Sequence, residues 1–132
     1  MKQLIMIVFA AVTTLVFGCA ADDGIKVITV NEFAEAVKSD TTAVILDVRT
    51  ADEFAEGHIE GAINMDVKND AAFDSGIKAL DSSKTYYVYC RSGRRSHKAA
   101  TKIQALGFKA IDMEGGITAW KDAKMPVETS LN

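Results

Sequence analysis

Hydrophobic residues along the chain alternate between two spacings, one typical of buried strands and one typical of amphipathic helices. Nearly continuous apolar or β-branched and aromatic runs, such as AVILDV and TYYVYC, predict strands. Segments with apolar residues every three or four positions predict helices. The predicted strands are residues 26–30, 43–48, 61–66, 85–90 and 108–115. The predicted helices are residues 31–39, 50–57, 70–80, 93–107 and 117–124.

Capping residues support several of these helix boundaries. Asn31 is a good N-cap residue for the first predicted helix. Thr50 is followed three residues later by Glu53, which predicts a capping box at the start of the second helix. Gly57 and Gly107 are placed where glycines commonly end helices.

About five alternations of strand and helix predict an α/β fold with a doubly wound, mostly parallel sheet and helices on both of its faces. In such sheets, ligands bind outside the carboxyl ends of the strands. Four residues with reactive or charged side chains fall near predicted strand ends, namely Asp47, Asp66, Cys90 and Glu114. We therefore expect a functional site at this edge of the sheet.

Length and charge narrow the possible partners. The chain has 132 residues, which suits a single domain, and we expect a monomer. The formal net charge of −3 does not favour nucleic acid as a partner. Residues 91–98 form a local basic island, so an anion is expected to bind there.

The N-terminal segment is typical of an export signal. Lys2 is followed by an uncharged, apolar-rich run at residues 4–17, which is shorter than the ~20 residues that span a bilayer as a helix. A basic start, an apolar middle and small residues after it indicate a secretory signal. We assign residues 1–18 to the signal peptide, 19–24 to a short tether and 25–132 to the folded domain.

Cys19 ends the segment VFGC, which resembles the lipobox of bacterial lipoproteins. That resemblance implies that Cys19 becomes the lipidated N-terminus. The protein would then be exported to the periplasm and anchored to a membrane through the lipid alone. The alternative is simple signal cleavage after Ala20 or Ala21, where the small residues also suit.

Cys90 is in either case the single thiol left in the domain, so we expect no disulfide and no cysteine metal cluster. It lies between a predicted strand and a predicted helix, where backbone N–H groups lack intrahelical partners. Cationic side chains crowd the same segment, namely Arg91, Arg94, Arg95 and Lys98. Both effects favour the thiolate, which is the nucleophilic form of cysteine.

Three segments together resemble the rhodanese-like sulfurtransferases. DVRTADEFAEGHIEGAINM at residues 47–65 is similar to a characteristic segment of that family, and CRSGRRS at 90–96 is similar to its active-site loop. LGFKAIDMEGGITAW at 106–120 resembles its closing strand, Gly-Gly turn and tryptophan. The order and spacing of these motifs extend the resemblance to residues 26–127, and imply a rhodanese-like fold.

The resemblance also implies a mechanism and an active-site loop. Cys90 would take a sulfane sulfur from a donor such as thiosulfate or a persulfide, and pass it to a cyanide or thiol acceptor, with no metal or other cofactor. Arg91 would contact an anionic donor. The implied loop comprises Cys90, Arg91, Ser92, Gly93, Arg94, Arg95 and Ser96.

Other polar residues near this site have structural interpretations. Asp47, Arg49 and Glu53 could form an acid–base set, but we expect an ion-pair network that ties a strand end to the following helix. We expect His58 to lie in a structural turn and His97 at the surface. Phe54 and Trp120 are expected in the core, and Gly115 and Gly116 in a strand-to-helix turn.

Two other function classes remain open. The first is a cysteine-based phosphatase or arsenate reductase, in which an arginine follows the nucleophile by six positions. Here Arg95 follows Cys90 by five, and Ser96 occupies the sixth position. The second is a non-catalytic binding module of rhodanese-like fold, but such modules often lack the cysteine.

Overall fold

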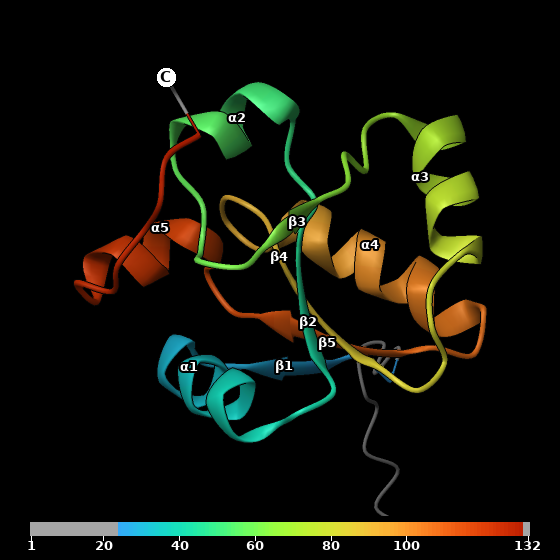
Figure 1. Ribbon diagram of the computed structural model, residues 1–132, viewed down its shortest axis with the longest axis horizontal. Coiled ribbons are helices and arrows are strands. Elements are labelled where there is room, and N and C mark those ends of the chain that lie inside the picture. The colour runs from blue at the N-terminus through green and yellow to red at the C-terminus, as the bar shows by residue number, and fades with distance from the viewer. Residues whose placement is uncertain (1–23, 131–132) are drawn as a thin grey trace, which may run out of the picture.

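The computed structural model describes residues 24–130 as one parallel five-stranded sheet with helices on both faces (Figure 1). The strand order is β1-β5-β4-β2-β3, and every neighbouring pair is parallel. The strands are β1 Lys26–Ile28, β2 Ala43–Asp47, β3 Ile63–Asn64, β4 Thr85–Tyr89 and β5 Lys109–Met113. The helices are α1 Val30–Ser39, α2 Ala51–Glu56, α3 Asp70–Lys78, α4 Arg94–Ala105 and α5 Gly116–Asp122.

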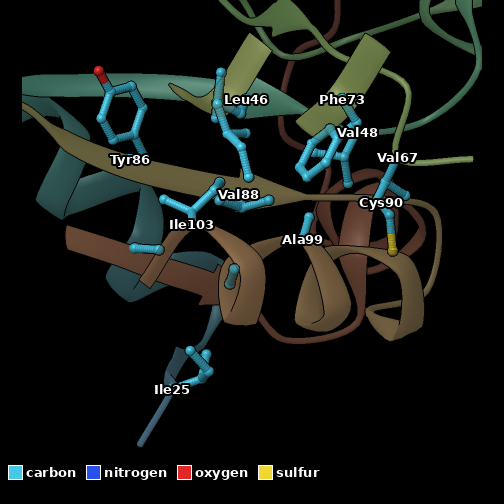
Figure 2. Packing of buried hydrophobic residues seen from close by; sticks show 13 residues of the cluster. Ile25, Leu46, Val48, Val67, Phe73, Tyr86, Val88, Cys90, Ala99 and Ile103 are labelled. Carbon is cyan, nitrogen blue, oxygen red and sulfur yellow. The ribbon is translucent and has the colours of Figure 1, made fainter. Parts of the chain in front are cut away.

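Alternate residues of each strand point to opposite faces of the sheet, and each face is buried by different helices. On one face, Leu46 and Val88 pack with Phe73 of α3 and Ile103 of α4 (Figure 2). On the other face, Phe33 of α1 and Trp120 of α5 belong to a second core. The predicted doubly wound architecture with about five strands is therefore confirmed.

One predicted helix start was wrong. We expected Asn31 to cap the first helix, but the N-cap is Thr29, and Val30 is the first helical residue. The Thr29 hydroxyl accepts a hydrogen bond from the Glu32 amide, and the Glu32 carboxylate accepts one from the Thr29 amide. This capping box satisfies two N–H groups, which the alternative cap at Asn31 would not do. Strand β1 accordingly ends at Ile28 instead of residue 30.

The second predicted capping box is confirmed. The Thr50 hydroxyl accepts from the Glu53 amide at 3.3 Å, and the Glu53 carboxylate accepts from the Thr50 amide at 3.4 Å. Helix α2 ends at Gly57, as expected. This short helix follows β2 directly, so its first turn lies at the carboxyl edge of the sheet.

The connections that leave β2 and β4 run in opposite directions. After β2 the chain moves outward to β3, whereas after β4 it moves the other way to β5. Because β2 and β4 are hydrogen-bonded neighbours, their carboxyl ends flank a topological switch point. Asp47 lies at the end of β2 and Cys90 directly follows β4, so both predicted site residues are at this switch point.

The predicted signal peptide and Cys19 lie outside the described residues, as does most of the predicted tether. In the part of the chain that the structure describes, none of the helices has the length and apolar character needed to cross a membrane.

Candidate active site

The cysteine loop is a tight turn between β4 and α4. Gly93 is the N-cap of α4 and has a φ of 108°, a backbone conformation that favours glycine. In this conformation the Gly93 N–H donates a hydrogen bond to the Cys90 sulfur at 3.0 Å. A backbone donor at a helix start stabilises negative charge on its acceptor. The turn therefore places an anion-stabilising group on the one cysteine of the described domain.

Helix α5 holds this loop from the opposite side. The Ile117 N–H donates to the Cys90 carbonyl at 2.9 Å, and the Thr118 N–H donates to the Arg91 carbonyl at 3.2 Å. A Cβ on Gly116 would lie 2.5 Å from these carbonyl groups, so the close approach requires glycine here. In a trans peptide the N–H points away from the C=O. The amides of Arg91 and Ser92 therefore point away from α5.

The Cys90 side chain is buried. Only 1% of the residue is exposed, and it belongs to the same apolar cluster as Val67 and Ala99. Figure 2 shows Cys90 at the end of this cluster, with its sulfur beside the loop that opens α4. A substrate must therefore approach through the loop itself, because the core covers the rest of the residue.

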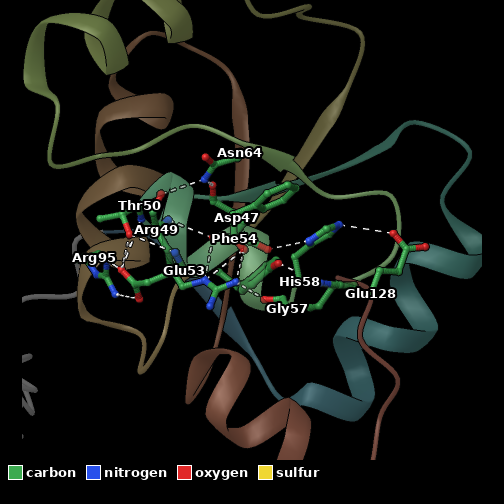
Figure 3. A network of polar contacts seen from close by, with 12 residues as sticks. Asp47, Arg49, Thr50, Glu53, Phe54, Gly57, His58, Asn64, Arg95 and Glu128 are labelled. Atoms are coloured by element: carbon green, nitrogen blue, oxygen red, sulfur yellow. Dashed lines mark hydrogen bonds and ion pairs between the residues drawn. The ribbon is translucent and has the colours of Figure 1, made fainter. Parts of the chain in front are cut away.

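Arg95 is bound to Glu53 and does not contribute a free charge to the loop. Its guanidinium donates to both carboxylate oxygens of Glu53, at 2.7 and 2.9 Å (Figure 3). The hydrogen bond from Arg95 is the largest influence on Glu53 and lowers its pKa to about 2. The pair connects α2 to α4 across the switch point. Of the three arginines in the loop, Arg91 and Arg94 are exposed and form no ion pair among residues 24–130.

Asp47 and Arg49 form a second, deeper ion pair. Arg49 donates to Asp47 through Nε at 2.9 Å and through Nη2 at 2.6 Å, and both side chains are at least 95% buried. The Arg49 Nη2 also donates to the Gly57 carbonyl at 2.6 Å, which joins the end of β2 to the end of α2. Asn64 donates to the carbonyl groups of Asp47 and Arg49 and adds β3 to the network (Figure 3).

The sequence indicated one ion-pair network for Asp47, Arg49 and Glu53, but the structure divides these residues between two pairs. Asp47 and Arg49 bind each other, whereas Glu53 binds Arg95. The Glu53–Arg95 pair was missed because its partners are 42 positions apart. Sequence patterns indicate contacts within one helix or strand, whereas this contact joins two helices.

Both histidines of the chain have neighbours that account for their positions. His58 stacks on Phe54 at 3.8 Å, its Nδ1 lies 2.8 Å from the Phe54 carbonyl oxygen, and its Nε2 lies 3.4 Å from Glu128. These contacts tie α2 to the C-terminal segment. The Nδ1 of His97, one turn into α4, lies 3.6 Å from Oδ2 of the buried Asp112. The sequence analysis did not single out Asp112, although a polar residue on an apolar strand face is a signal.

A cleft of about 320 Å³ opens beside the cysteine loop. Arg91 contributes to it from the loop, Glu56 from α2, and Thr118 and Lys121 from α5. Arg94 does not line this cleft, although it is also exposed. Arg91 is thus the loop arginine that meets a small molecule entering the cleft.

Metal ligands do not gather anywhere in residues 24–130: no group of three or more histidine, cysteine, aspartate or glutamate side chains could hold a metal ion there. The groups that the structure places at the cysteine loop and its cleft include the Cys90 sulfur, the Gly93 amide and the Arg91 side chain.

The chain is similar to proteins of one known family. The family model described as "Rhodanese-like domain" matches residues 29–123. Thiosulfate sulfurtransferase 18 of Arabidopsis thaliana is 38% identical over 96 residues, covering 64% of this chain and 71% of the relative. Thiosulfate sulfurtransferase 16, chloroplastic, of the same plant is 37% identical over 95 residues, covering 63% and 78%. The crystal structure of a rhodanese-related protein from Thermoplasma volcanium superposes with a TM-score of 0.70 at 31% identity, covering 78% of this chain and 97% of that one.

Proposed function

The chain belongs to the rhodanese-like family, and from this premise we propose that it is a sulfurtransferase that carries sulfane sulfur on Cys90. The observation that carries the proposal is the hydrogen bond from the Gly93 amide to the Cys90 sulfur, at the start of α4. A sulfur held in this way is stabilised as an anion and is a better nucleophile than a neutral thiol.

The proposed reaction has two displacement steps. The Cys90 thiolate attacks the outer sulfur of thiosulfate, a new S–S bond forms, and the original S–S bond breaks with its electron pair leaving on sulfite. An acceptor thiolate, or cyanide, then attacks the terminal sulfur of the Cys90 persulfide. The S–S bond to Cys90 breaks and the thiolate returns. The persulfide is also an anion, and the amides of Arg91 and Ser92, which point away from α5, are available to it.

The contacts of the loop argue against the phosphatase alternative. A phosphatase loop needs an arginine free to bind two oxygens of a tetrahedral anion. Arg95 comes nearest to the required position, five residues after Cys90, and both of its terminal nitrogens donate to Glu53. The Ser96 hydroxyl is also engaged, since it donates to the Gly93 carbonyl at 3.1 Å. A non-catalytic binding module would have no need for the hydrogen bond from the Gly93 amide to the Cys90 sulfur.

Intact-mass analysis tests the proposal directly. The protein is incubated with thiosulfate, a small-molecule persulfide or a phosphate ester, and then with a thiol. We expect the mass of one sulfur atom to be added by a sulfur donor and removed by the thiol. Phosphate-ester hydrolysis faster than sulfur transfer would support the phosphatase alternative instead. No added sulfur and no hydrolysis would support the binding module.

Replacing Arg91 with glutamine is expected to weaken the use of thiosulfate more than the use of a neutral persulfide. Arg91 lines the cleft, and its charge can bind the anionic donor but has no such partner on a neutral one. Because Arg91 is exposed, we expect a loss of about 10-fold in kcat/KM, the lower end of what a charge-assisted hydrogen bond contributes. The measurement is steady-state kinetics with both donors at low and high salt, because screening should reduce the difference.

Arg94→Gln is the matched control for this experiment. It removes the same charge from the same loop at an exposed position outside the cleft, so its effect on thiosulfate should be smaller. Equal losses with both donors in Arg91→Gln, together with a higher pH midpoint for Cys90 alkylation, would mean that Arg91 tunes the nucleophile and does not bind the donor.

We further propose that the protein is exported and anchored to a membrane through a lipid on Cys19, on the basis of the segment VFGC that follows an apolar run. Cys19→Ser should move the full-length protein from the membrane fraction to the soluble fraction and change its electrophoretic mobility. If neither property changes, simple signal cleavage at Ala20 or Ala21 becomes the preferred account.

A further inference from the structure

The Glu53–Arg95 ion pair borders the cleft beside the cysteine loop, yet the proposed reaction uses neither side chain. Arg95 donates to both carboxylate oxygens of Glu53, in the bidentate geometry that guanidinium groups also use on phosphate. Glu53 lines the cleft together with Arg91, whereas Arg95 does not. The pair is accessible, because 27% of the Glu53 side chain and 20% of the Arg95 side chain are exposed. Without the charge of Glu53, this guanidinium would be available to an anion in the cleft.

The Glu53 carboxylate is held in place independently of Arg95, by the N-cap of its own helix. Its Oε1 accepts a hydrogen bond from the Thr50 hydroxyl at 3.1 Å and one from the Thr50 amide at 3.4 Å. The same oxygen accepts from Arg95 at 2.7 Å, and Oε2 accepts from Arg95 at 2.9 Å. An anion that takes Arg95 from this position must therefore break two hydrogen bonds to a fixed carboxylate.

Acidification does not release Arg95 from this pair. The hydrogen bond from Arg95 is the largest influence on Glu53 and lowers its pKa to about 2, so the carboxylate stays ionised at neutral and mildly acidic pH. A guanidinium stays protonated over the same range. Both charges of the pair are therefore present whenever a donor or a competing anion enters the cleft.

Two kinds of anion could be bound at the cysteine loop, and they need different groups from it. A persulfide on Cys90 is attached covalently, and its charge lies on one sulfur atom that backbone amides can stabilise. A free tetrahedral oxyanion has no covalent bond to the protein, and an arginine that reaches two of its oxygens strengthens its binding. Because both terminal nitrogens of Arg95 donate to Glu53, that arginine does not serve a free oxyanion.

We propose that Glu53 is a positioning residue, which holds Arg95 away from anions in the cleft and so keeps the cysteine loop selective for sulfur donors over unreactive oxyanions such as phosphate and sulfate. The inference rests on the proposed function, because it explains how a donor is used in the presence of anions of similar shape. Thiosulfate is less affected than these anions, since its outer sulfur reacts with Cys90 and its use does not depend on tight binding of its oxygens.

Titration with sulfate at constant pH and ionic strength tests this inference. Sulfate carries no sulfane sulfur, so its binding is measured apart from sulfur transfer. Glu53→Gln removes the charge that holds Arg95 but retains the capping box, since glutamine also serves at this position of a helix. We expect the variant to bind sulfate at least about 10-fold more tightly than the wild-type protein, the lower end of what a charge-assisted hydrogen bond contributes. The dissociation constant is measured by NMR, from the shift of the Arg95 Nε–H signal and of the backbone amides of the loop.

Two control variants separate the release of Arg95 from other effects of the substitution. Glu56→Gln removes one negative charge from the same helix and the same cleft, but Glu56 forms no ion pair among residues 24–130, so its gain in sulfate affinity should be smaller. The double variant Glu53→Gln/Arg95→Gln lacks the guanidinium, so its sulfate affinity should not exceed that of the wild-type protein. A merely structural role for Glu53 would produce no gain in affinity in any of these variants.

The inference is wrong if Glu53→Gln gains no sulfate affinity, if the gain equals that of Glu56→Gln, or if it persists in the double variant. Glu53→Asp serves if Glu53→Gln fails to fold, because it keeps the charge on a side chain that is too short for the same bidentate contact. A gain in sulfate affinity is expected there too, and its absence would also overturn the inference. The titration does not depend on turnover, so this inference and the proposed sulfur transfer can fail separately.

Discussion

Cys90→Ser is expected to abolish sulfur transfer, with a loss of at least about 1000-fold in kcat, because a neutral hydroxyl cannot form the sulfur–sulfur bond of the intermediate. The change replaces one atom, and the Gly93 amide can still donate to the new hydroxyl oxygen. The measurement is turnover of thiosulfate with cyanide or a thiol as acceptor, beside the intact mass after exposure to donor. The variant should acquire no added sulfur.

Stability must be measured in the same variant, because Cys90 also belongs to the buried core. The serine hydroxyl is more polar than the thiol, and its burial among Val67 and Ala99 should cost about 1–2 kcal/mol. That cost lowers the melting temperature by several degrees without unfolding the protein. A folded Cys90→Ser protein that retains substantial turnover would show that another group carries the sulfur.

Arg49→Met is expected to lower the free energy of unfolding by about 3–5 kcal/mol, since it leaves the Asp47 carboxylate buried without its cation. It also removes the donor to the Gly57 carbonyl, so the end of α2 loses its tie to β2. Urea denaturation measures the loss. Turnover per folded molecule should fall much less, because Arg49 is bound to Asp47 and is not available to a substrate.

The double variant Asp47→Asn/Arg49→Met distinguishes a buried ion pair from a general loss of packing. With both charges removed, no unpaired charge remains, and the double variant should be more stable than Arg49→Met alone. Arg49 also borders the cleft beside the loop, so a catalytic role is testable in the same series. If Arg49→Met keeps its stability and loses turnover, Arg49 acts on the substrate and the structural assignment is wrong.

The parts of the fold that depend on neighbouring residues were predictable from the sequence. The capping box of Thr50 and Glu53 and the glycine that ends α2 follow from local hydrogen-bonding rules, and the structure has both. The N-cap of the first helix was misplaced by two residues because Asn31 and Thr29 are both competent caps. Only the reciprocal bond from Glu32 distinguishes them, and its three-residue spacing from Thr29 was visible in the sequence.

The parts of the site that depend on distant residues were not predictable in this way. The loop sequence indicated a cluster of cationic side chains, but it did not show that Arg95 forms an ion pair with Glu53 of α2. The hydrogen bonds from Ile117 and Thr118 are made by backbone amides, which have no residue-type signature. Asp112 is the exception: strand periodicity places it on a buried face, where an acidic residue is unexpected.

The hydrogen bonds from the α5 amides to the Cys90 and Arg91 carbonyls make the cysteine loop depend on a segment that is synthesised after it. Helix α5 is the last helix of the described residues, and the five strands of the sheet and α4 precede it along the chain. A chain that ends before Gly116 contains the whole sheet and the cysteine, but its loop lacks both backbone donors. Cys90 is therefore synthesised before the segment that fixes its loop, so a chain that ends between the two has the cysteine without the hydrogen bonds from α5.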